Sequence, residues 1–266
     1  MAALTLTPLG TNGFIPTHGR QTMSYLVRSG EDALLLDAGT GLSRLLVPPL
    51  AGVLAGRERV DLLLTHYHLD HTVGLSYLTA LFPRTAVRVW APAPPLVDGT
   101  PAEGLGRLIA PPLFPIRLED FPAGVEVVPY AAEELEVAGL RLRLRRQRHA
   151  GGSVGVVIDD RLGYLTDCEV DEGSAPFVRG LELLLHEVWV TDEEAAAGAQ
   201  RRGHSTVSDV ARLADACGAG TLMPVHHHPT RDAESLRALT ARLAELTSAR
   251  VLLPEEGREY EIGKGE

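Results

Sequence analysis

The sequence contains only two cysteines, Cys168 and Cys217, among its 266 residues. Two cysteines at this separation exclude a disulfide framework and a zinc site of the Cys-x-x-Cys type. No apolar run approaches the roughly 20 residues that span a bilayer, and residues 1–10 lack the basic and apolar segments of a signal peptide. We therefore expect a cytoplasmic protein without a membrane partner.

Positive charge is also scarce. The chain has 25 Lys and Arg against 35 Asp and Glu, which gives a formal net charge of −10. Binding to a nucleic-acid backbone depends on basic side chains that neutralise phosphates, so this balance disfavours a stable nucleic-acid partner. The arginines from Arg141 to Arg148 are a local exception, but they alternate with apolar residues as on a strand with one solvated face.

The length and the hydrophobic content of 45% allow a well-buried core. No linker divides the chain, so we expect a single domain over residues 1–266. The stretch 91–122 is dense in proline and glycine but also contains scattered apolar residues, which is typical of a structured insertion or lid. Whether it lines a pocket or is a surface loop stays open.

The highest density of potential metal ligands lies in a short run of histidines and one aspartate, which follows the apolar stretch 60–64. His66 and His68 alternate, which places two imidazoles on the same side of an extended chain. Asp70 and His71 are then directed to a second position. Imidazoles and carboxylates suit Zn²⁺, Mn²⁺ or Fe²⁺. The run therefore predicts a metal site, with two ions.

Several other apolar runs rich in Val, Ile and Leu also end at a histidine or an aspartate, and helical patterns lie between them. A single strand-end aspartate often forms a turn, and a single strand-end histidine is often structural. The repetition indicates that strand ends converge on one edge of packed sheets. The residues at these ends are Asp37, His149, Asp167, His186 and His226.

Three helices are predicted from apolar periodicity and capping residues. The first runs from Thr72 to Phe82 before a proline. The second begins with the Thr206–Asp209 capping pair and continues to Cys217 before a glycine. The third runs from Asp232 to Leu246 with leucines on one face. Strands and helices thus succeed one another in both halves of the chain.

The His-x-His-x-Asp-His run, together with the strand-end residues, resembles the metallo-β-lactamase fold hydrolases along essentially the whole chain. The resemblance implies an α/β protein with a four-layer αββα sandwich, in which two mixed sheets are flanked by helices and two metals lie at one edge. It implies zinc as the first choice of metal, with manganese or iron as alternatives, and no organic cofactor.

The same resemblance implies a ligand set. It assigns His66, His68 and His149 to the first ion, Asp70, His71 and His226 to the second, and Asp167 to both. His226 opens a His-His-His-Pro sequence, and the family pattern selects it because it directly follows a strand and lies three residues before the proline. His227 and His228 are the alternatives.

The order of the motifs along the chain narrows the range of reactions that the resemblance implies. Gly203-His204-Ser205-Thr206, ahead of a helix and the strand to His226, resembles the phosphodiesterase branch of the family, which includes ribonuclease Z and smaller cyclic-nucleotide or phosphonate-pathway diesterases. Ribonuclease Z of the usual type inserts a long tRNA-binding arm between its third metal histidine and its bridging aspartate. Here only residues 150–166 lie between His149 and Asp167. We therefore expect a small or nucleotide-like phosphodiester as substrate.

In such a site, two ions lower the pKa of a shared water and provide hydroxide as the nucleophile. His204 and Asp70 are the candidate catalytic residues, with His204 as proton donor to the leaving group or as a clamp on a phosphoryl oxygen. A capping or packing role for His204 beside Thr206 is the alternative. Asp37 and His186 are expected to orient ligands by hydrogen bonds, and a purely structural role fits His186 equally well.

Two other functions fit the same residues. One is hydrolysis of a carboxylic ester, lactone or thioester, which the His204 motif disfavours. The other is a non-catalytic metal-binding sensor or interaction protein, which the full set of seven expected ligands disfavours. A homodimer is compatible with the sequence.

Overall fold

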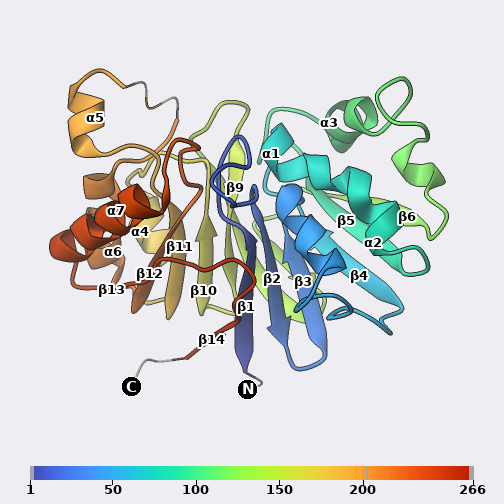
Figure 1. The fold of residues 1–266 in the computed structure, drawn as a ribbon, viewed down its shortest axis with the longest axis horizontal. Helices are drawn as coiled ribbons and strands as arrows, with labels where there is room; N and C mark the ends of the chain where they lie inside the picture. The colour runs from blue at the N-terminus through green and yellow to red at the C-terminus, as the bar shows by residue number, and fades with distance from the viewer. Residues whose placement is uncertain (1–2, 200, 202, 264–266) are drawn as a thin grey trace.

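The computed structural model describes residues 3–199, 201 and 203–263 (Figure 1). Within these residues the strands form two sheets of seven strands each. From edge to edge, the first sheet consists of β14 (Tyr260–Ile262), β1 (Leu4–Gly10), β2 (Ser24–Ser29), β3 (Asp32–Leu36), β4 (Arg59–Leu63), β5 (Ala86–Pro92) and β6 (Val125–Tyr130).

Both sheets are mixed and share one pattern of strand directions. In each sheet the first four strands pair antiparallel, and from the fourth strand to the other edge the pairings are parallel. This repetition agrees with two related αβ halves. The second sheet consists of β7 (Glu134–Val137), β8 (Leu140–Gln147), β9 (Ser153–Ile158), β10 (Leu162–Leu165), β11 (Leu183–Glu187), β12 (Thr221–Val225) and β13 (Arg250–Val251).

Helices cover the outer face of each sheet (Figure 1). None of those in the described residues has the length and apolar character that crossing a bilayer requires. The α-helices are α1 (Leu69–Thr72), α2 (Leu78–Leu81), α3 (Pro101–Leu108), α4 (Ser174–Phe177), α5 (Asp192–Ala196), α6 (Val207–Cys217) and α7 (Ala233–Leu246), and the 3₁₀ helices are η1 (Thr40–Leu46), η2 (Val73–Tyr77) and η3 (Leu118–Asp120).

Successive side chains of a strand point to opposite faces of its sheet, and this alternation divides the apolar residues between layers. In β3, Leu34 and Leu36 point into the core between the sheets, whereas Leu35 points under the helices of the first sheet. The central core joins both sheets, with the rings of Tyr25 and Tyr164 only 5.2 Å apart. A third core lies between the second sheet and the helices α6 and α7. The predicted αββα sandwich with two mixed sheets is confirmed.

The helix predictions differ in their outcome. The two C-terminal helices begin at the predicted caps, Thr206 and Asp232. The predicted helix from Thr72 to Phe82 is instead divided into the end of α1, η2 and α2. The backbone N–H of Gly74 donates to the carbonyl of Ala38 at 2.7 Å, so it is used outside the helical ladder. This outside bond interrupts the regular α-helix at that point.

The stretch 91–122 contains regular secondary structure. It contains the end of β5, then α3 and η3, and its buried Leu105, Ile109 and Phe121 pack with the core beneath the first sheet. Leu113, in contrast, is largely exposed.

Gly74→Ala is expected to lower the free energy of unfolding by about 1–3 kcal/mol. A Cβ at this position would collide with the backbone oxygen of Gly39, which has no room to move away. Gly106, within α3, is the matched control because nothing lies within 4 Å of its added Cβ. Gly106→Ala should be neutral or stabilise by up to about 1 kcal/mol. Urea unfolding tests both variants, and equal stability of the two would contradict this interpretation.

Candidate metal centre

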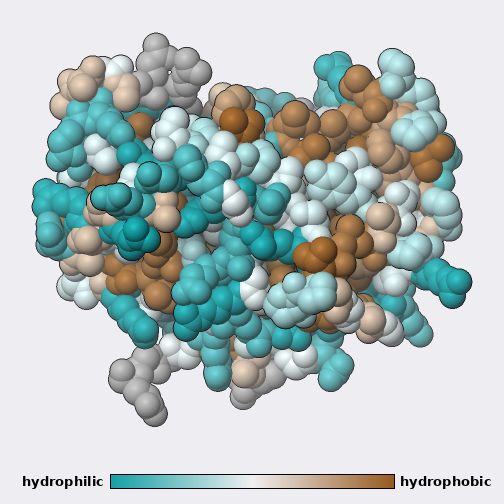
Figure 2. Space-filling view, viewed as in Figure 1, coloured by the Kyte–Doolittle hydropathy of each residue, from teal (hydrophilic) through white to brown (hydrophobic). Residues whose placement is uncertain are grey.

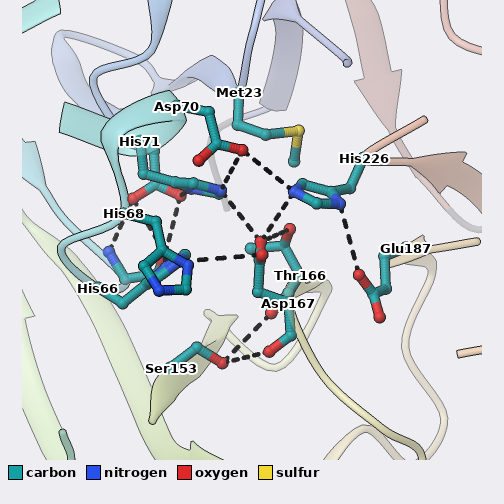
Figure 3. A network of polar contacts seen from close by, with 12 residues as sticks. Met23, His66, His68, Asp70, His71, Ser153, Thr166, Asp167, Glu187 and His226 are labelled. Atoms are coloured by element: carbon teal, nitrogen blue, oxygen red, sulfur yellow. Dashed lines mark hydrogen bonds and ion pairs between the residues drawn. The ribbon is translucent and has the colours of Figure 1, made fainter. Parts of the chain in front are cut away.

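The site forms where strands of both sheets end. Asp37 follows β3, Asp167 follows β10 and His226 follows β12. All three have a left-handed backbone, with φ of 57°, 51° and 51° respectively, which residues other than glycine adopt rarely. Such conformations persist only where the surrounding structure holds them, and they concentrate at functional sites. Figure 3 shows Asp167 and His226 facing one another across this edge.

The carboxylate of Asp167 lies at the middle of the cluster. Its Oδ1 is 3.4 Å from Nε2 of His149 and 3.9 Å from Nε2 of His66. Its Oδ2 is 3.0 Å from Nε2 of His71 and 3.2 Å from Nε2 of His226. Each oxygen therefore faces a different pair of imidazoles.

The potential ligand atoms divide into adjoining groups, each within 4.8 Å. Asp70 completes the second group, because its Oδ2 lies 3.4 Å from Nε2 of His226 and 3.6 Å from Nε2 of His71. His204 also comes within reach of Asp167 and His226. The groups are His66, His68, His149 and Asp167; Asp70, His71 and His226; and Asp167, His204 and His226.

Several imidazole nitrogens at this centre lack a hydrogen-bond partner although they are buried. They are the Nε2 atoms of His66, His71 and His226, all of which face Asp167. A buried polar atom is normally paired, so unpaired nitrogens that converge on a carboxylate need a ligand. Nitrogen and oxygen donors in this number fit two divalent cations.

The charge states of the first group suit a cation, whereas at His71 burial is outweighed by the carboxylates of Asp167, Asp70 and Asp37, which raise the pKa of the ring well above its ordinary value. Burial lowers the pKa of His66, His68 and His149, which keeps these imidazoles in the neutral form that binds metals. Burial alone would raise the pKa of Asp167, but the facing His226 and His71 hold it well below its ordinary value. The carboxylate at the middle is therefore ionised.

His204 lies at the edge of the cluster in a fixed orientation. Its ring stacks on Trp189 with centroids 4.6 Å apart, and its centroid is 5.1 Å from that of His149. Nδ1 lies 2.7 Å from Oε2 of Glu187. Burial lowers the pKa of His204, but the Glu187 carboxylate outweighs it and the net pKa is raised. His204 is thus held in one orientation beside the potential ligands.

Glu187 is a site residue that the sequence reasoning missed. Its carboxylate is fully buried and accepts hydrogen bonds from the backbone N–H of Ser205 at 2.8 Å and of Cys168 at 3.2 Å. A signal for it was present in β11, because Leu183 and Leu185 both face the central core. Strand alternation therefore turns Glu187, two residues further on, to the same side.

His186 points the other way for the same reason. Its Nδ1 contacts the backbone carbonyl of Glu187 at 2.8 Å and its Nε2 lies 3.8 Å from the sulfur of Cys168. Neither partner is a predicted ligand. The contacts of His186 are those of a buried structural histidine.

Asp37 is connected to the metal centre by its contact with the ring of His71. One oxygen lies 2.9 Å from Nδ1 of His71 and accepts a hydrogen bond from the hydroxyl of Tyr164 at 2.8 Å. The other accepts from the backbone N–H of Thr65 at 2.7 Å. This fully buried carboxylate fixes the ring that faces Asp167 and links it to both sheets.

Of the histidine triplet, only His226 faces the cluster. His227 is fully buried on another side, where burial and then Arg20 lower its pKa to about 3. His228 is half-buried and its Nδ1 lies 2.8 Å from the hydroxyl of Thr230. The geometry favours His226 over the two alternatives.

Comparison with known proteins identifies the family of this chain. Residues 33–227 match the model of the beta-lactamase superfamily domain. The chain belongs to this superfamily. It is 28% identical to ribonuclease Z of Bradyrhizobium diazoefficiens, over 90% of this chain and 94% of that protein.

Solved structures share the fold of this superfamily member over its full length. The metallo-beta-lactamase fold protein YhfI of Bacillus subtilis superposes with a TM-score of 0.75 at 20% identity, covering 97% of this chain and 99% of that one. A diphosphatase of the PhnP family has a TM-score of 0.70 at 17% identity, covering 98% of both chains. Superfamily membership and the His/Asp cluster together indicate a divalent-metal site.

Asp167→Asn is expected to lower the metal content of the purified protein from about two ions per chain to fewer than one. The substitution removes the charge that both groups of imidazoles share. Asp171→Asn is the matched control, because Asp171 pairs with Arg145 outside the cluster. Elemental analysis after dialysis measures both variants, and an unchanged metal content in Asp167→Asn would contradict a shared carboxylate.

Proposed function

We propose that this chain is a metal-dependent phosphodiesterase that acts on a small or nucleotide-like phosphodiester. The observation that carries the proposal is the Asp167 carboxylate, which faces two groups of potential ligands beside the His204–Glu187 pair. Two adjacent cations and a proton carrier are what hydrolysis of a phosphodiester requires. The ribonuclease Z relative and the diphosphatase of the same fold support phosphorus chemistry.

The distances within the cluster support a ligand assignment. We propose that His66, His68 and His149 hold one ion, that Asp70, His71 and His226 hold the other, and that Asp167 touches both. Zinc is our first choice because imidazole nitrogens dominate the donors, and manganese or iron fit the same set.

A bound pair of divalent ions supplies positive charge to the phosphoryl group and makes water a usable nucleophile at neutral pH. Residues of the chain itself protonate the leaving group. Protonated His204 keeps its Nδ1 bonded to Glu187 and gives a proton from Nε2 to the departing alkoxide. The Trp189 stack and the backbone bonds to Glu187 hold both groups in place.

The short segment between His149 and Asp167 supports a small substrate. These residues form β9 and β10, joined by the short turn 159–161. The described chain therefore has no projecting arm at this point, and this supports a small substrate over a structured RNA. Cleavage of RNA, suggested by the name of the relative, is the competing use of the same chemistry.

The stretch 91–122 is proposed as one wall of the substrate approach within a single 1–266 domain. The backbone N–H of Asp98 donates to the carbonyl of Gly151 at 2.7 Å, and Asp98 also pairs with Arg146. These bonds attach the stretch to the loop that follows His149. Figure 2 shows hydrophobic surface gathered over α1 and α3, on the side of this wall.

The test of the function is a substrate panel with zinc- or manganese-loaded protein. Bis(p-nitrophenyl) phosphate and 2′,3′- and 3′,5′-cyclic nucleotides are expected to be hydrolysed, whereas lactones and thioesters are not. A precursor tRNA should be a poor substrate. Preferential cleavage of lactones or thioesters would instead establish the ester-hydrolase alternative, and preferential cleavage of the precursor tRNA would establish RNA processing.

Histidine variants separate the proton carrier from the metal site in the same assay. His204→Ala should lower kcat for the phosphodiester by about 10²–10⁴-fold while both ions remain bound. His228→Ala is the matched control, because His228 also contacts Trp189 but lies outside the ligand groups. Full activity of His204→Ala would remove His204 from the mechanism.

A groove next to His149 supports an anionic substrate. Its volume is about 730 Å³, and Arg146, Arg148, Glu169 and Gly203 contribute to its lining. The side chain of Arg148 is 71% exposed and comes no closer than 4.0 Å to the carboxylate of Glu169. A guanidinium with only this loose partner can present two N–H groups to a pair of phosphate oxygens.

Arg148→Ala is therefore expected to raise KM for phosphodiester substrates by about fivefold, which corresponds to about 1 kcal/mol. kcat should change little, because Arg148 binds the substrate outside the reacting bond. Arg141 is the matched control: it lies on β8, which ends directly before Arg148, is 74% exposed and has a similarly loose partner at 3.8 Å. Equal kinetics of the Arg148→Ala and Arg141→Ala proteins would show that the groove does not bind the substrate.

A further inference from the structure

The loop between β1 and β2, residues 11–21, touches both halves of the metal centre. The backbone N–H of Phe14 donates to Oδ2 of Asp70 at 2.6 Å. Gly13 lies flat against the ring of His226, where any Cβ would collide with the imidazole. Phe14 itself has a left-handed backbone, with φ of 64°, so the loop holds an unfavourable conformation at its contact with Asp70.

The loop is also bonded to the turn that carries His226. Gly13 donates its N–H to the carbonyl of His227 at 3.0 Å, and His227 donates to the carbonyl of Thr11 at the same distance. The hydroxyl of Thr17 donates to the carbonyl of Pro229 at 2.6 Å. The loop thus connects Asp70, from the first half of the chain, with His226, from the second half.

One distant carboxylate holds both ends of this loop. Oε1 of Glu256 accepts hydrogen bonds from the N–H of Thr11 at 2.9 Å, from its hydroxyl at 3.0 Å and from the N–H of Gln21 at 3.0 Å. Oε2 pairs with the guanidinium of Arg44. The Glu256 side chain is only 6% exposed, and the next residue, Gly257, donates to the carbonyl of Pro8 at 2.7 Å.

We propose that Glu256 is a positioning residue for the second metal position. By holding the ends of the loop 11–21, it sets the separation of Asp70 and His226 and therefore the affinity for the ion that they share with His71. This inference rests on the proposed two-ion centre. Glu256 and the loop both lie outside residues 33–227, which match the superfamily model, so this support is a property of the flanking segments of this chain.

The test compares Glu256→Gln with Glu259→Gln. Glutamine at position 256 keeps only one acceptor oxygen. With that oxygen in the place of Oε1, the NH₂ group still removes the bond from the N–H of Gln21 to Oε2 at 3.2 Å and the pairing with Arg44. Glu259 is the matched control because its carboxylate lies close by in sequence but pairs with Arg28 and Thr5. Zinc is titrated into each metal-free protein, and the two binding steps are followed by calorimetry and elemental analysis.

We expect wild type and Glu259→Gln to bind two zinc ions with the same affinities. In Glu256→Gln one step should be unchanged and the other weakened by about 10-fold or more, as with other residues that orient metal ligands. Equal weakening of both steps would reveal a general loss of stability and would overturn the proposal. Two unchanged steps, or fewer than two ions in wild type, would also overturn it.

Thr17→Val provides a second approach if Glu256→Gln does not fold. It removes the bonds of the Thr17 hydroxyl to Pro229 and Asn12 and leaves Glu256 intact. In Thr17→Val the zinc affinity should fall at the same binding step as in Glu256→Gln. An unchanged affinity at that step would contradict the role of the loop. Because the readout is metal affinity, a protein that binds two ions but cleaves no phosphodiester would refute the proposed function and leave this inference standing.

Discussion

The structure depends on one buried charge, the carboxylate of Asp167 among four histidines. An ionised carboxylate away from water is costly unless other groups compensate it. In the proposed two-ion centre the compensation comes from the cations, which would lie between this carboxylate and the imidazoles of His66 and His149 at one oxygen and of His71 and His226 at the other. These residues come from both halves of the chain, so neither sheet alone can accommodate the charge.

The rest of the fold positions the residues around this carboxylate. Parallel strands in each sheet end at the same edge, and left-handed residues at these ends direct side chains toward the centre. Buried polar groups then fix the rings, as Asp37 does for His71 and Glu187 does for His204. The structural core and the functional site are thus continuous, since Tyr164 packs between the sheets and also donates to Asp37.

Much of this organisation is predictable from the sequence because the signals are local. The His-rich run after β4, the strand ends at Asp167 and His226 and the capping residue Thr206 each combine a pattern with a residue type. Other features depend on tertiary contacts. The helix after His71 is interrupted by a backbone bond between Gly74 and Ala38, which no periodicity reveals.

Glu187 and Glu256 illustrate two further limits of local signals. Glu187 was overlooked in favour of His186, although the alternation of β11 distinguishes them once its inward face is known. Glu256 lies 235 positions from Gln21, and nothing in its neighbourhood marks it as a partner of the loop. Such long-range support becomes visible only when the two sheets are placed together.

Anomalous diffraction from crystals of the zinc-loaded protein tests the central claim most directly. A carboxylate shared between two ions predicts two zinc peaks, one near Oδ1 of Asp167 with His66 and His149, and one near Oδ2 with His71 and His226. A single peak, or two peaks of which only one contacts Asp167, would contradict it.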